Sequence, residues 1–185
     1  IVFGDWSSDV CSSDLVRRLA ECPGVVLSVS ATTRPQGPNE VDGVDYYFLN
    51  RAAFEAKVAA GEFLEHAEYM GNLYGTPAEP VNQAMRQGKV VLLEIDMQGG
   101  LQVARQRPEA AMVFILPPDA EAVWRRLKGG GRDAVEVMEK RLANAQSEIQ
   151  QARQSGIYRH FVVNAEVDDA VNEIQRLIEA RRGPR

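Results

Sequence analysis

The sequence is poor in cysteine, lacks an excess of basic residues and has no long apolar segment. Its two cysteines, Cys11 and Cys22, are too few for a disulfide framework or a four-cysteine metal site. A formal net charge of -5 does not fit a protein that neutralises many nucleic acid phosphates. No apolar run reaches the roughly 20 residues of a membrane helix, and no signal-peptide pattern is present. We therefore expect a soluble, cytoplasmic protein that binds neither membranes nor nucleic acid polymers.

Short apolar runs alternate with helical patterns along the 185 residues. Helix patterns run from Asp119 to Leu127, from Asp133 towards Gln154, and over residues 51–60 and 167–182. Because the apolar runs are continuous rather than alternating, they predict parallel strands that are covered on both faces. We expect an α/β fold with a doubly wound parallel sheet in a single domain, residues 1–185. The expected strands are residues 1–3, 25–29, 90–95, 112–116 and 161–163.

Two regions interrupt this alternation. Residues 31–88 are rich in turns and short aromatic runs around the expected helix, which predicts a lobe inserted into the sheet. Residues 128–132 contain three consecutive glycines between two helical patterns. Such a run can act as a hinge, so we expect a small helical lid there.

Hydroxyl and guanidinium groups follow the second expected strand. Ser30, Thr33 and Arg34 lie where open α/β sheets bind ligands. Arg34 suits a phosphate because its planar fork can donate two parallel hydrogen bonds. Taken alone, the segment could equally be a polar turn.

Further polar residues follow within the expected lobe. The hydroxyls of Tyr46 and Tyr74 can bind phosphate oxygens, whereas an ionised Glu65 can only accept hydrogen bonds. Guanine presents two adjacent donors, N1–H and its 2-amino group, and therefore suits such an acceptor. Together these residues indicate a pocket for a nucleoside monophosphate.

Five ordered motifs carry a resemblance to a known family. They read Ser-Val-Ser-Ala-Thr-Thr-Arg, Glu-Val-Asp-Gly-Val-Asp-Tyr, Gly-Glu-Phe-Leu-Glu, Tyr-Gly-Thr-Pro and Leu-Glu-Ile-Asp-Met-Gln-Gly. In this order and spacing they resemble the guanylate kinases, from about residue 25 to residue 181. The resemblance implies a kinase-like P-loop NTPase core, phosphoryl transfer from ATP to GMP giving ADP and GDP, and Mg²⁺ as cofactor. It also implies a GMP-binding lobe at residues 31–88 and a lid at residues 128–141.

The resemblance assigns a role to each matching position. It implies that guanine is recognised by Glu65 and Thr76, while Glu94 and Asp96 close the site from the sheet. Asp96 would lie near Mg²⁺ and the phosphates. The positions implied to bind the GMP phosphate are Ser30, Arg34, Tyr46 and Tyr74.

Three residues of the second half complete the implied site. Arg126 and Arg141 match lid arginines that would stabilise the transferring phosphoryl group. Each could instead be a solvated helix charge. Asn164 resembles a position near the adenine of ATP, although a strand-ending asparagine is often only a turn residue.

The ATP side departs from the family pattern. Such a kinase should carry Gly-x-x-x-x-Gly-Lys-Ser/Thr after its first strand. Residues 4–14 contain no lysine and place Asp5, Asp9 and Asp14 where an anionic nucleotide would sit. They contain Ser-Ser-Asp twice, which resembles translated sequencing-adapter read-through. One hypothesis is therefore that these residues are an assembly artefact. The alternative is a natural protein that has lost its ATP site. Either way, the chain as written is expected to be impaired in ATP binding.

Two single positions also differ. Gly37 stands where the family usually has a second phosphate-binding arginine, which predicts weaker GMP binding. Gly130 replaces a lid arginine, which predicts a slower transfer.

Two other functions fit part of the pattern. A catalytically dead guanylate-kinase-like module could bind GMP or a phosphorylated peptide through the lobe. A kinase for another nucleoside monophosphate is disfavoured by Glu65 and Thr76, because adenine offers an acceptor where guanine offers a donor. The pattern does not indicate an oligomeric state or a protein-bound metal.

Overall fold

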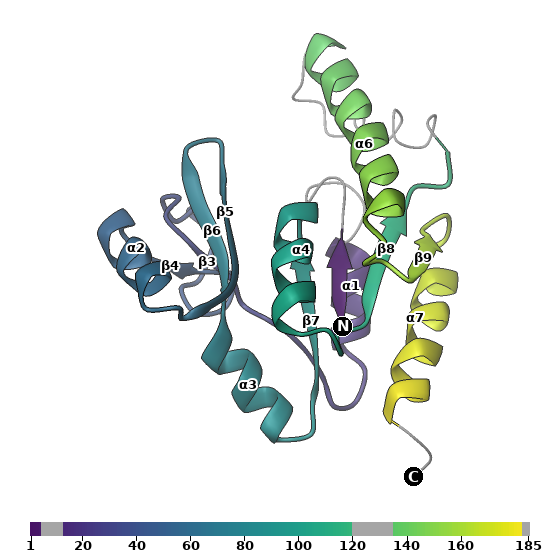
Figure 1. Cartoon of the computed structure of the whole chain (residues 1–185), viewed down its shortest axis with the longest axis horizontal. Helices are drawn as coiled ribbons and strands as arrows, with labels where there is room; N and C mark the ends of the chain where they lie inside the picture. Colours follow the sequence, from purple (N-terminus) through teal and green to yellow (C-terminus); the bar gives the residue numbers. More distant parts are fainter. Residues whose placement is uncertain (5–12, 120–134, 183–185) are drawn as a thin grey trace.

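A computed structural model of the chain describes residues 1–4, 13–119 and 135–182 (Figure 1). The predicted segments 119–127 and 128–141 fall wholly or partly outside these ranges, as do residues 5–12 of the atypical segment. The helices and strands are, in chain order, β1 (Val2–Gly4), α1 (Ser13–Ala20), β2 (Val25–Leu27), β3 (Ala31–Thr32), β4 (Tyr47–Phe48), α2 (Arg51–Ala59), β5 (Phe63–Tyr69), β6 (Asn72–Pro77), α3 (Ala78–Arg86), β7 (Val90–Ile95), α4 (Met97–Gln106), β8 (Met112–Leu116), α6 (Val135–Ser155), β9 (His160–Val163) and α7 (Val167–Arg182).

Five of the strands form a parallel sheet in the order β2-β7-β1-β8-β9. The prediction of a parallel α/β sheet is therefore confirmed, and every strand of this sheet overlaps one of the predicted apolar runs. The central strand β1 has β7 and β2 on one side and β8 and β9 on the other, so the chain adds strands on both sides of β1. In open α/β sheets, ligands bind at the carboxyl edge where the strand order changes direction in this way.

Both faces of this sheet are buried, because side chains alternate along its strands. On β8, Val113 and Ile115 point into a core that is covered by α1 and α7. Met112, Phe114 and Leu116 point into the opposite core, which is closed by α4 and α6. This arrangement explains why the strands read as continuous apolar runs in the sequence.

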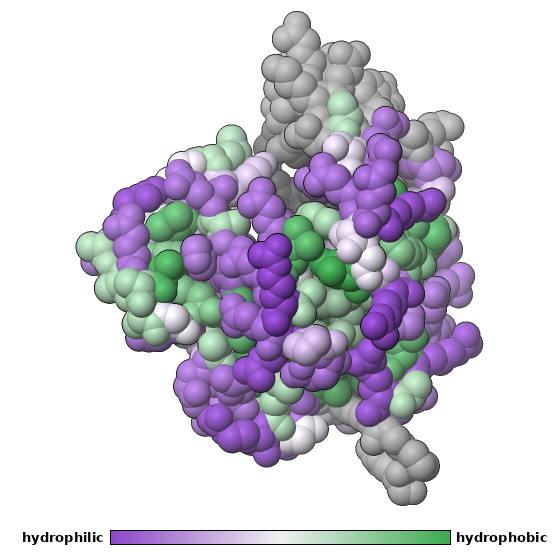
Figure 2. Space-filling model, viewed as in Figure 1, coloured by the Kyte–Doolittle hydropathy of each residue, from purple (hydrophilic) through white to green (hydrophobic). Residues whose placement is uncertain are grey.

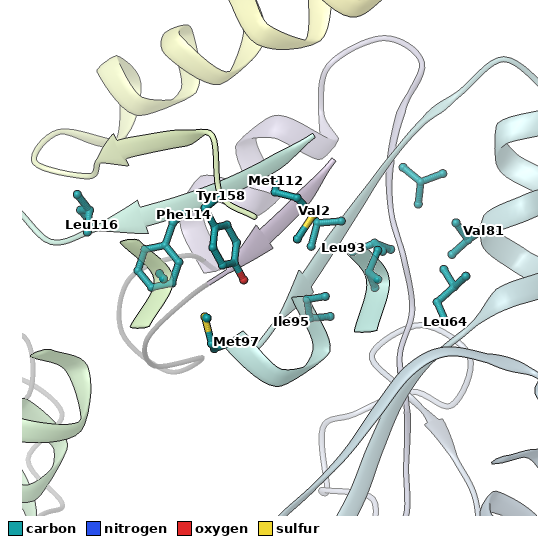
Figure 3. Packing of buried hydrophobic residues seen from close by; sticks show 13 residues of the cluster. Val2, Leu64, Val81, Leu93, Ile95, Met97, Met112, Phe114, Leu116 and Tyr158 are labelled. Atoms are coloured by element: carbon teal, nitrogen blue, oxygen red, sulfur yellow. The ribbon is translucent and has the colours of Figure 1, made fainter. Parts of the chain in front are cut away.

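Tyr158 lies in the core on the α4 and α6 side of the parallel sheet, where it helps to bring α4 close to β1 (Figure 3). Its ring packs edge-on against Phe114, with centroids 5.1 Å apart. A Cβ atom at Gly4 or at Gly100 would collide with the Tyr158 ring or hydroxyl. The two glycines thus allow the end of β1 and the first turn of α4 to approach the same buried side chain.

A second, four-stranded sheet has the order β4-β3-β6-β5. It lies to one side of the parallel sheet and carries α2 on its outer side (Figure 1). Helix α2 begins at Asn50, whose side chain accepts a hydrogen bond from the amide of Ala53 at 2.8 Å. Phe54 of α2 stacks on Phe63 of β5, with centroids 4.5 Å apart. The helix predicted at residues 51–60 is therefore present, one residue shorter.

The visible face of the molecule is mainly hydrophilic, with smaller hydrophobic areas between the polar side chains (Figure 2). None of the helices within the described ranges is long and apolar enough to cross a membrane.

Candidate active site

A buried carboxylate on the second sheet faces the start of α4. Glu65 of β5 is paired with Thr76 of β6 in the antiparallel register. The Thr76 hydroxyl donates a hydrogen bond to Glu65 Oε1 at 2.6 Å, and both residues are buried. A Cβ atom at Gly99 would lie 2.8 Å from Glu65 Oε2. The carboxylate thus occupies a space that only the missing side chain of Gly99 leaves open.

Burial also changes the acidity of Glu65. Desolvation, with a smaller contribution from the nearby charge of Asp96, raises the pKa of this carboxyl to about 7, although the hydrogen bonds of Thr76 oppose the shift. A carboxyl with this pKa exchanges its proton near neutral pH. Glu65 can therefore present two acceptor oxygens, but only after it loses that proton.

Arg34 is held by Glu40 in the loop between β3 and β4. Its Nη1 and Nη2 atoms donate to the two Glu40 oxygens at 3.0 and 2.6 Å, and the Gly37 amide donates to Glu40 at 2.6 Å. The guanidinium also lies over the rings of Tyr46 and Phe48, 5.5 and 5.9 Å from their centroids. The Glu40 hydrogen bond raises the pKa of Arg34, and the Arg34 and Gly37 hydrogen bonds lower the pKa of Glu40. Both groups are charged at neutral pH.

Two tyrosines lie beside Arg34. Tyr46 and Tyr74 meet edge to face, with ring centroids 6.2 Å apart. Burial is the main cause that raises the pKa of Tyr46, with smaller effects of Tyr74 and of the neighbouring charged side chains. Tyr46 therefore stays protonated at neutral pH and can donate a hydrogen bond. Ser30 is half-buried nearby, where its carbonyl accepts from the Tyr47 amide at 2.9 Å.

Asp96 lies at the carboxyl end of β7 and begins α4. Its Oδ1 atom accepts the Gly99 amide at 2.7 Å, which fixes the side chain as the helix N-cap. Within the described ranges no group of three or more His, Cys, Asp or Glu side chains could hold a metal ion. Mg²⁺ is often bound by one or two carboxylates together with substrate phosphates. Asp96 and the neighbouring Glu94 match that donor set.

The structure brings most of the predicted site residues to one region between the two sheets. These residues are Ser30, Arg34, Tyr46, Glu65, Tyr74, Thr76, Glu94 and Asp96. Asn164 follows β9 at the same edge of the parallel sheet, where it is buried. Its backbone N–H donates a hydrogen bond to the Leu116 carbonyl at 2.8 Å. Arg126 and Gly130 lie outside the described residues, and Arg141 lies in α6 without a described side chain.

Two residues that shape the candidate site, Glu40 and Gly99, were not assigned a role from the sequence. Glu40 stands in a quoted motif, and a carboxylate six residues after an arginine in a turn-rich loop is the signal that could have marked the pair. Gly99 gives no such signal, because its importance depends on Glu65, which approaches it from another sheet.

The parallel sheet and the polar residues gathered at its carboxyl edge define the class as an α/β nucleotide-binding fold. A model of the guanylate kinase family, described as "Guanylate kinase", matches residues 7–181. This chain belongs to the guanylate kinase family.

Individual relatives agree with this assignment. A guanylate kinase of Thermus thermophilus is 44% identical over 176 residues, which cover 95% of this chain and 79% of the relative. A guanylate kinase of Gloeobacter violaceus is 46% identical over 172 residues, covering 92% and 82%. The crystal structure of guanylate kinase from Anaplasma phagocytophilum superposes with a TM-score of 0.77 at 30% identity, covering 99% of this chain and 85% of that one.

Proposed function

We propose that the pocket between the two sheets binds GMP and that the family reaction of this chain is phosphoryl transfer from ATP to GMP. The observation that carries the proposal is the buried pair of Glu65 and Thr76. When Glu65 is ionised, its carboxylate accepts the two adjacent donors on the guanine edge. Thr76 holds the carboxylate in place, and Gly99 leaves the room that it needs.

The phosphate of GMP would bind at the Arg34 end of the pocket. Arg34 supplies charge-assisted hydrogen bonds, and Ser30, Tyr46 and Tyr74 supply hydroxyl donors. Strands β3 and β5 both pair with β6. This pairing fixes the distance between the base end of the pocket, on β5 and β6, and the phosphate end, which follows β3. The pocket therefore orients the substrate phosphate at the carboxyl edge of the parallel sheet.

Mg²⁺ would be held by Asp96, with Glu94 beside it, together with phosphate oxygens of the nucleotides. When bound, it neutralises charge on the phosphates. The fixed N-cap geometry of Asp96 gives the carboxylate one orientation. Asp96 thus belongs to the reacting end of the site, whereas Glu65 belongs to the base-reading end.

Other parts of the proposal rest on the resemblance. Residues 31–88 form the GMP-binding lobe and residues 128–141 the lid. Arg126 and Arg141 would stabilise the phosphoryl group in transfer, and Asn164 would lie near adenine. The bacterial relatives favour a cytoplasmic location, where both nucleotide substrates occur.

A role as a phosphopeptide-binding module is less well supported. Such a partner would use Arg34 and the tyrosines but would leave the buried, hydrogen-bonded Glu65 without a ligand for its acceptor oxygens. The Glu65 and Thr76 pair therefore favours a guanine nucleotide.

We further propose that the chain as written binds GMP but turns over ATP poorly, because residues 4–14 do not contain the Gly-x-x-x-x-Gly-Lys-Ser/Thr pattern and have no lysine. Calorimetry with GMP and guanosine tests the pocket, and a coupled ADP-release assay tests turnover. A second chain, in which a Gly-x-x-x-x-Gly-Lys-Ser segment replaces this stretch, is the matched comparison. We expect similar GMP affinity in both chains and much faster turnover in the second. No GMP binding by either chain would contradict the proposed pocket, and normal turnover by the first would contradict the impairment.

A further inference from the structure

A polar pocket lies at the edge of the parallel sheet opposite the candidate GMP site. Its volume is about 240 Å³. It is bounded by the end of α4, the start of β8, the turn between α6 and β9, and the end of α7. The GMP-site residues Asp96 and Glu94 lie at the carboxyl edge instead. The pocket is therefore separate from the candidate GMP site, although α4 extends from one towards the other.

Three arginines from different segments line this pocket. They are Arg107 after α4, Arg159 before β9 and Arg181 near the end of α7, and His160 lies among them. Among the residues that the structure describes, no Asp or Glu contributes to the lining. In a chain with a formal charge of -5, this is a local concentration of positive charge.

The arginines are also not neutralised by carboxylates of the described residues. Arg107 donates to Asn82 Oδ1 at 2.5 Å and Arg181 to the Glu109 carbonyl at 2.8 Å, so both are positioned by neutral acceptors. Across the described ranges, the Arg159 side chain has no hydrogen bond or ion pair. The pocket thus holds guanidinium donors that an incoming anion can use.

We propose that this arginine pocket binds the phosphate or pyrophosphate group of a small anionic ligand. Three guanidinium groups carried by separate segments around one pocket suit a group with many acceptor oxygens. The volume is smaller than the roughly 300 to 1,000 Å³ of pockets for drug-sized ligands, which favours a compact anion. The same chemistry is offered by free pyrophosphate and by the diphosphate of a nucleotide.

The test is calorimetric titration of inorganic pyrophosphate into the full chain and its variants. The double variant Arg159→Gln, Arg181→Gln removes two charges without touching Arg107, which is hydrogen-bonded to α3. We expect it to weaken pyrophosphate binding by about tenfold or more. Arg86→Gln, an exposed arginine paired with Glu79, is the matched control and should leave the affinity unchanged. Thermal unfolding of each variant establishes that it is folded.

The GMP site must be separated from this signal, because it also attracts phosphate. Arg34→Gln should not alter the pyrophosphate affinity of the arginine pocket. In amide NMR spectra, pyrophosphate should shift the resonances of Gly156 and Ile157. If Arg34→Gln abolishes binding while the double variant retains it, or if only resonances near Ser30 shift, the proposal is wrong. Titration of ADP in the same variants distinguishes the sources: tighter binding than pyrophosphate indicates a nucleotide diphosphate, and equal or weaker binding indicates the free anion.

Discussion

Arg34 and Glu40 form a two-point ion pair that uses one edge of the guanidinium. Nη1 donates to Glu40 and to the carbonyl of Pro35, at 3.0 and 2.9 Å, and Nη2 donates to the other Glu40 oxygen at 2.6 Å. An arginine has five N–H donors, so Nε–H and the second Nη2–H are used neither by Glu40 nor by Pro35, and Tyr74 also forms a side-chain hydrogen bond with Arg34. Glu40 therefore fixes the orientation of Arg34, and the donors that Glu40 does not use, on the side shared with Tyr74, are those that the proposed GMP phosphate would need.

The first prediction concerns this pair. Glu40→Gln keeps the size of the side chain but removes the charge that holds Arg34, so we expect GMP to bind several-fold more weakly. Guanosine has no phosphate and should bind the variant and the parent chain equally. Calorimetry with both ligands measures the difference. Tighter GMP binding in the variant would instead mean that Glu40 competes with the phosphate for Arg34.

A second prediction concerns the glycine next to this pair. Gly37→Arg restores a cation at a position where the family usually has one, and we expect GMP to bind about tenfold more tightly. A Cβ atom at Gly37 would lie 2.8 Å from Glu40 Oε2, so the flexible carboxylate must move slightly. Gly37→Ala introduces the same Cβ without the charge and is the control. Equal affinities of the two variants for GMP would show that the added arginine does not reach the phosphate.

A third prediction follows from the acidity of Glu65. The proposed recognition of guanine needs the ionised carboxylate, whose pKa in the free protein is about 7. Guanosine should therefore bind more tightly as the pH rises from 5.5 to 8, with the affinity falling roughly tenfold for each pH unit well below 7. Guanosine is used because the phosphate of GMP itself titrates in this range. Glu65→Gln should bind weakly with little dependence on pH, and an equally flat profile for the parent chain would refute the role of Glu65.

The sequence predicted the parts of the fold that depend on local pattern. Strands such as residues 90–95 and 112–116 are buried on both faces, so composition alone marks them. Strands β3 and β4 contain two residues each and carry no periodic signal. They exist because Ala31 pairs with both Tyr47 and Gly75, which are distant in the chain.

The same distinction applies to the site. Glu65 and Thr76 could be proposed as base-reading residues because their motifs match a family. Their direct contact depends on the β5 and β6 register, which contains an irregularity between Phe63 and Glu65. The raised pKa of Glu65 depends on burial and on Asp96, and neither is visible before the two sheets are placed together.

The last prediction turns the raised pKa of Glu65 into a statement about stability. In the unfolded chain this carboxyl has a pKa near 4.5, and in the folded chain it is about 7. The folded state therefore binds more protons between these values, and stability falls as the pH rises from about 4.5 to 7. At pH 8 the full cost is on the order of 3 kcal/mol.

Glu65→Gln removes that cost and retains an oxygen that can accept the Thr76 hydrogen bond. The free energy of unfolding of the variant, measured with urea, should exceed that of the parent chain at pH 8, and the difference should shrink towards pH 5. Glu68→Gln, on the exposed part of the same strand, should show no such dependence because its carboxylate is solvated. If Glu65→Gln is the less stable protein at pH 8, Glu65 does not carry a desolvation cost. Its place in guanine recognition would then rest on the contact with Thr76 alone.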